Sequence, residues 1–135
     1  MAPVVRVVAL ADVDAVVDLE PIVTEERFEE LVADALDGLP DWVRERMENV
    51  DVLVAAGPPR DQPGLLGLYE GIPLTRRGFG YAGVLPDRIT LFRSNLLHGA
   101  RTEEEVRRRI RRTVVHEIAH FFGISDDRLR EIDRY

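Results

Sequence analysis

The sequence contains no cysteine, which excludes disulfide bonds and thiolate-based metal sites. It also lacks lysine, because all 18 basic residues are arginine, a bias that we attribute to genome composition. Histidine is scarce, with three in 135 residues. Any metal site in this chain must therefore be built from histidine imidazoles and carboxylates.

Long hydrophobic runs are also missing. No segment approaches the ~20 apolar residues of a membrane-spanning helix, and Val4–Leu10 has neither the length nor the flanks of a signal peptide. We therefore expect a cytoplasmic protein without a membrane partner. The net charge of −7 disfavours a nucleic-acid partner. The length and the hydrophobic content of 45% indicate one soluble globular domain.

Two of the three histidines lie in one motif, since residues 116–126 read HEIAHFFGISD. On a helix, His116 and His120 share one face, with Cβ atoms about 5–6 Å apart, so both can bind one metal ion. Glu117 is placed to take a proton from a metal-bound water. Gly123 can end the helix because glycine tolerates positive φ, and the turn allows Asp126 to reach the same ion as a third ligand.

The motif is unlike a chance match. A random chain with these residue frequencies would contain His-Glu-x-x-His about once in 150 trials. The simpler alternative is a surface helix with two ordinary histidines. The position of the motif late in a strongly amphipathic helix, instead of in a loop, favours metal binding.

The remaining sequence predicts a mixed set of elements. Residues 1–23 are read as an N-terminal extension with a short strand in Val4–Leu10, and residues 24–135 as the domain. In the first half of the domain we expect a helix capped by Thr24, a short helix from Asp41, a strand Val50–Ala56 and a strand or tight turn in Leu65–Leu74. A long loop Thr75–Pro86 should follow, and then a strand Arg88–Arg93 and a helical turn through Leu97. The chain should end with a long helix from Thr102 to Phe122 and a short helix Asp126–Arg134.

The long helix carries a run of arginines that could suggest nucleic acid. Helical spacing favours a solvated face instead, because three glutamates each precede an arginine by four residues. The expected pairs are Glu103–Arg107, Glu104–Arg108 and Glu105–Arg109. The opposite face of this helix carries an apolar stripe that we expect to pack in the core, formed by Val106, Ile110, Val114, Ile118 and either Phe121 or Phe122.

Taken together, these features resemble a known family, the small bacterial zincin-like metallopeptidase domain that was formerly a domain of unknown function. The resemblance covers about residues 25–135 and rests on the Leu65–Gly71 block, on Leu85–Phe92 and on the His116–Asp126 signature. It implies an α+β minimal zincin-like fold, a small mixed sheet packed against the metal-binding helix. It also implies that the cofactor is Zn²⁺, with ligands and a general base at His116, His120, Asp126 and Glu117.

The sequence departs from the larger zincin classes. Metzincins have a methionine turn after the site, but Met1 and Met47 both precede it. A gluzincin would take its third ligand from a later helix, where Glu131 is the only glutamate after His120. Glu131 is therefore a competing ligand, and Asp126 is preferred because it directly follows the glycine turn.

The leading hypothesis is a zinc metallopeptidase acting on a peptide or protein substrate, with Arg88–Arg93 as a strand edge for an extended peptide. A metal-containing binding or regulatory module with little or no hydrolytic activity is the alternative. A nucleic-acid hydrolase is a third, weaker reading, which the acidic charge disfavours. No oxyanion donor is obvious, and the candidates are Tyr69, Tyr81, His98 and Tyr135.

Overall fold

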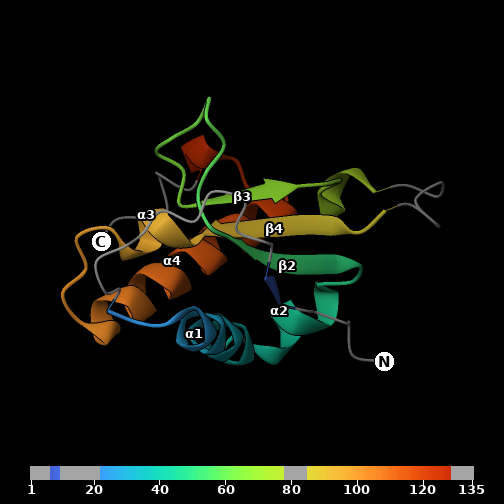
Figure 1. Ribbon diagram of the computed structural model, residues 1–135. Helices are drawn as coiled ribbons and strands as arrows, with labels where there is room; N and C mark the ends of the chain where they lie inside the picture. Colours follow the sequence, from blue (N-terminus) through green and yellow to red (C-terminus); the bar gives the residue numbers. More distant parts are fainter. Residues whose placement is uncertain (1–6, 10–21, 78–84, 129–135) are drawn as a thin grey trace.

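The computed structural model describes residues 7–9, 22–77 and 85–128. Within them, a four-stranded sheet has the order β1-β2-β4-β3. Helices α1 and α4 pack against each other and against the sheet (Figure 1). The fold is α+β, as expected. None of the helices in these segments is long and apolar enough to cross a membrane.

The sheet is mixed. Strands β1 (Val7–Ala9), β2 (Val50–Ala55) and β4 (Asp87–Phe92) run parallel, and β3 (Gly67–Glu70) runs antiparallel to β4. The strand expected within residues 4–10 therefore forms, and it pairs with β2. The division of the chain at residue 24 stays a prediction.

The expected edge strand was wrong. Strand β4 pairs with β2 on one side and with β3 on the other, so it lies inside the sheet. The reason is burial, because Ile89, Leu91 and Phe92 are all buried in this apolar strand. The edge of the sheet beside α4 belongs to β3 (Figure 1).

Helix α1 (Glu25–Asp37) begins as predicted, because the Thr24 hydroxyl accepts a hydrogen bond from the Arg27 N–H at 3.1 Å. The short helix α2 (Asp41–Arg46) leads into β2. After β3 comes the 3-10 turn η1 (Leu74–Arg76), and after β4 the short helix α3 (Arg93–Leu97). The rest of the predicted long loop, residues 78–84, lies outside the described segments.

Helix α4 (Glu103–Phe121) carries the motif. Thr102 caps it by accepting from the Glu105 N–H at 3.1 Å. The Glu105 carboxylate accepts from the N–H of Arg101 at 3.1 Å, one residue before the partner that a capping box would use. The predicted apolar stripe is confirmed, since Val106, Ile110, Val114 and Ile118 are all buried.

The expected ion pairs of α4 form only in part. Glu103 pairs with Arg107 at 3.9 Å as predicted, but Glu104 also pairs with Arg107, at 3.6 Å. Arg109 does not pair with Glu105 and instead donates to the carbonyls of Leu96 and His98, at 3.2 and 2.7 Å. Arg109 therefore caps the carbonyl end of α3, while the Glu105 carboxylate accepts from the Arg101 N–H instead.

Burial of Val114, which is 1% exposed, gives a test of how α4 supports the site. Val114→Ala should lower the free energy of unfolding by about 1–3 kcal/mol and weaken binding of the predicted zinc ion, because Val114 anchors α4 in the core just before the turn that carries His116. Chemical denaturation and a zinc titration measure both effects. Val115→Ala is the matched control, since Val115 is 49% exposed. Equal effects of the two substitutions would contradict this role.

Candidate active site

The C-terminal end of α4 brings the three predicted ligand side chains together. The rings of His116 and His120 lie edge to face with centroids 4.9 Å apart. One Asp126 carboxylate oxygen lies 3.3 Å from His116 Nε2 and 3.0 Å from His120 Nε2. One donor atom from each residue therefore lies within 4.8 Å of the other two.

This donor set fits zinc. Bonds of about 2.0–2.2 Å in a tetrahedral site place ligand atoms about 3.3–3.6 Å apart, and the two His–Asp separations of 3.3 and 3.0 Å are close to that spacing. Two imidazoles and one carboxylate are ligands that zinc prefers. His116 and Asp126 are both partly open to solvent. Such a site leaves room for a further ligand.

A sharp turn after α4 returns Asp126 to the histidines. Gly123 N–H donates to the His120 carbonyl and Ile124 N–H to the Ala119 carbonyl, both at 2.9 Å. This pair of bonds is a Schellman motif, and Gly123 has the positive φ of 87° that the motif requires. A Cβ on Gly123 would also overlap the Thr75 side chain. The predicted glycine turn therefore forms, and it packs against η1.

The same turn orients one of the predicted ligands. His120 Nδ1 lies 2.9 Å from the Ile124 carbonyl oxygen. A proton on Nδ1 donates to that carbonyl, which leaves the Nε2 lone pair directed at Asp126 and at the metal position. Helix α4 is followed at Asp126 by the start of another helix, capped by the Ser125 hydroxyl, which accepts from the Arg128 N–H at 3.2 Å. The rest of that predicted helix, and Glu131 with it, lies outside the described residues.

Glu117 lies beside the ligands but points between α4 and β3. It is 6% exposed. Burial raises the pKa of its carboxyl above the usual range, while the neighbouring histidines and a hydrogen bond from the Tyr69 backbone N–H oppose that rise. A buried carboxylate with one fixed donor is suited to proton transfer, because its orientation is restricted and its proton affinity increased.

A glycine in β3 allows this contact. A Cβ on Gly67 would lie 2.8 Å from the Thr113 methyl carbon and 3.2 Å from Glu117 Cγ. Any larger residue would push β3 away from α4 and move the Tyr69 N–H away from Glu117. The leucine- and glycine-rich block of residues 65–71 thus has a structural explanation, which sequence reasoning did not supply.

Sequence reasoning also missed a buried polar cluster behind β3. The Asp87 carboxylate, 2% exposed, accepts hydrogen bonds from the Tyr69 hydroxyl at 2.6 Å, Arg77 Nη2 at 2.7 Å and the Ile72 N–H at 3.2 Å. The Arg77 guanidinium also lies over the Phe121 ring, 4.9 Å from its centroid. The only sign of this cluster in the sequence is an aspartate at the start of an apolar strand. This cluster fixes Tyr69 and the loop after β3 to the end of α4.

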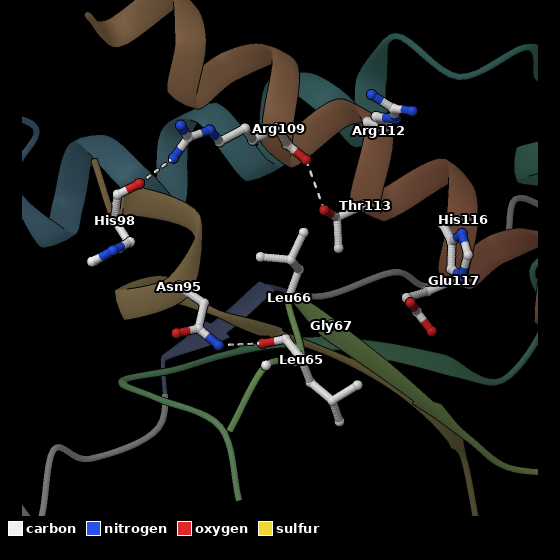
Figure 2. Close-up of a pocket in the computed structure, with 11 residues that line it drawn as sticks. Leu65, Leu66, Gly67, Asn95, His98, Arg109, Arg112, Thr113, His116 and Glu117 are labelled. Carbon is white, nitrogen blue, oxygen red and sulfur yellow. Dashed lines mark hydrogen bonds between the residues drawn. The ribbon is translucent and has the colours of Figure 1, made fainter. Parts of the chain in front are cut away.

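The structure describes two of the four candidate oxyanion donors. The Tyr69 hydroxyl donates to Asp87, and the contact of this residue with Glu117 is made by its backbone. His98 lies at the end of a cavity opposite to His116 and Glu117 (Figure 2). Tyr81 and Tyr135 lie outside the described residues. In the described part of the chain, none of the predicted candidates therefore places a side-chain donor beside the predicted metal ligands.

That cavity adjoins the site. It measures about 570 Å³ and lies between α4, the end of α3 and the segment that leads into β3. Figure 2 shows His116 and Glu117 at one end and His98 and Asn95 at the other, with Leu65 and Leu66 between them. A group bound in this cavity would contact the general-base candidate directly.

Comparison with known proteins identifies the family of the chain. The chain belongs to the zincin-like metallopeptidase family, whose family model matches residues 47–135. It is similar to a solved structure of a conserved hypothetical protein from Thermo thermophilus, with 26% sequence identity and a TM-score of 0.52. The match covers 74% of this chain and 94% of that one. No curated protein matches the chain.

Proposed function

We propose that this protein is a zinc-dependent peptidase in which His116, His120 and Asp126 hold the metal and Glu117 is the general base. The observation that supports this most directly is the position of Glu117. Its buried carboxylate adjoins the three-ligand cluster and is held by the Tyr69 N–H. Membership of the zincin-like metallopeptidase family supports the same reading.

Zinc bound by these residues would lower the pKa of a water molecule to about 7 and polarise the substrate carbonyl. Glu117 takes the proton of the attacking water and delivers it to the leaving amine. The raised pKa of Glu117 favours this transfer, because a carboxylate with a higher proton affinity accepts the proton more readily. The Tyr69 N–H restricts the orientation of this carboxylate beside the cluster.

The exposed edge of the sheet offers a position for the substrate backbone. Among the described residues, β3 pairs with β4 alone, so its other edge can accept an extended peptide at the positions beside the Tyr69 N–H, which Glu117 already occupies. Tyr69 and Gly67 belong to this strand and approach α4. A peptide added to β3 would therefore pass next to Glu117.

The test is peptide cleavage that depends on the metal. Protein loaded with zinc should cleave members of a mixed peptide library, chelation should remove the activity, and added zinc should restore it, with products followed by mass spectrometry. Stoichiometric zinc binding without cleavage of any peptide would instead support the alternative, a metal-containing binding or regulatory module. Absence of zinc binding would contradict both readings.

A further inference from the structure

The cavity beside the site carries positive charge in an acidic protein. The chain has a net charge of −7, but the cavity is lined by Arg109, Arg112 and His98, and Glu117 is the only carboxylate among its described lining residues. Glu117 lies at the end next to the metal ligands (Figure 2). The remainder of the cavity therefore favours an anionic group.

The arginines reach the cavity because of helical spacing. Arg109, Arg112, Thr113 and His116 follow the i, i+3, i+4, i+7 pattern and share one face of α4. This face begins at the metal ligand and extends toward the N-terminal end of the helix. A substrate residue entering beside His116 would thus meet the arginines in order along α4.

The charge of Arg109 is not neutralised by the predicted partner. Glu105 accepts from the Arg101 N–H, and Arg109 Nη1 donates to two neutral carbonyls. In the described part of the chain, Arg109 forms no ion pair with a carboxylate. Its positive charge is held beside the cavity by α3, as Figure 2 shows for the His98 carbonyl.

The opposite wall is apolar and fixed. Leu65 and Leu66 line it, and the Asn95 amide donates to the Leu65 and Pro63 carbonyls at 2.7 and 2.9 Å. Thr113 turns its hydroxyl to the Arg109 carbonyl, at 2.8 Å, and its methyl group toward Gly67. An aliphatic stem can pack between these walls while its charged end faces the arginines.

We propose that this cavity binds a carboxylate carried by the substrate residue next to the cleaved bond, which makes the protein selective for acidic or carboxyl-terminal residues. This inference rests on the proposed peptidase function. The carboxylate can belong to a glutamate or aspartate side chain, or to the C-terminus of a peptide. Both present the same chemistry to Arg109 and Arg112.

Binding is measured in the zinc-loaded Glu117→Gln protein, so that the result does not require turnover. The first comparison uses pairs of capped peptides that differ only by glutamate or glutamine at one position. The position changes from one pair to the next. A second pair carries glutamine throughout and ends in a free or an amidated carboxyl group. We expect the carboxylate member of one pair to bind about tenfold more tightly, which identifies the source of the group.

Arg112→Gln should reduce this preference to about threefold or less. Arg111→Gln is the matched control, because Arg111 is an exposed neighbour on α4 that does not line the cavity. The proposal would be overturned by equal binding of the two members in both comparisons, or by no measurable binding of any peptide. It would also be overturned by an equal effect of the two arginine substitutions. If the wild-type protein cleaves no peptide but the binding preference is observed, only the peptidase function is contradicted.

Discussion

Glu117→Gln should retain zinc and lose nearly all peptide hydrolysis. Glutamine preserves the size of the side chain and can still accept the Tyr69 N–H through its carbonyl oxygen, but it cannot take a proton from water. General-base catalysis typically contributes about 10²–10⁴-fold to a rate, so turnover should fall by a factor in that range. Metal analysis and the initial rate on one peptide that the wild-type protein cleaves provide the measurement.

Glu104→Gln is the control for this substitution, because Glu104 is an exposed residue at the other end of the same helix. It should leave the rate unchanged. A wild-type rate in Glu117→Gln would rule out the base role. Loss of zinc from Glu117→Gln would show that the carboxylate is a ligand.

His116→Ala or His120→Ala should weaken zinc binding by more than about a hundredfold, since even residues that only orient a ligand often contribute about 10–100-fold to metal affinity. Competition with a chelator of known affinity measures the change. His98→Ala removes the remaining histidine, which lies at the far end of the cavity, and should leave zinc affinity unchanged. Full zinc occupancy in either motif mutant would contradict the assignment of the metal site.

The same competition assay ranks the third ligand. Asp126→Ala should weaken zinc strongly, because its carboxylate oxygen lies within 3.3 Å of both imidazoles. Glu131→Ala should have little effect. The reverse order would place the third ligand on the later segment, in a gluzincin-like arrangement.

Local features of the chain could be predicted from its sequence. The caps at Thr24 and Thr102, the apolar stripe of α4 and the turn at Gly123 depend on residues within a few positions of each other. Hydrogen bonding and side-chain periodicity act over the same short range. The three proposed metal ligands share this property, and for that reason the cluster could be anticipated.

Features that depend on distant segments could not be predicted in this way. Whether β4 lies inside the sheet or at its edge depends on its pairing with β2 and β3, and strand periodicity alone does not determine a neighbour. The contact between Tyr69 and Glu117 requires the same pairing. The partner of Arg109 could not be predicted for the same reason. Helical spacing places Arg109 near Glu105, but its hydrogen bonds go to carbonyls at the end of α3, a separate segment.

The short sequence span of the ligands also separates metal capture from catalysis. All three proposed ligands lie within residues 116–126, so a partly unfolded chain can still chelate zinc and the ion will stabilise the native state less than one that links distant segments. Glu117, in contrast, obtains its hydrogen-bond donor from Tyr69 in β3. On the proposed function, detachment of β3 would therefore abolish catalysis while the metal stays bound, and zinc content would overstate the active fraction of a preparation.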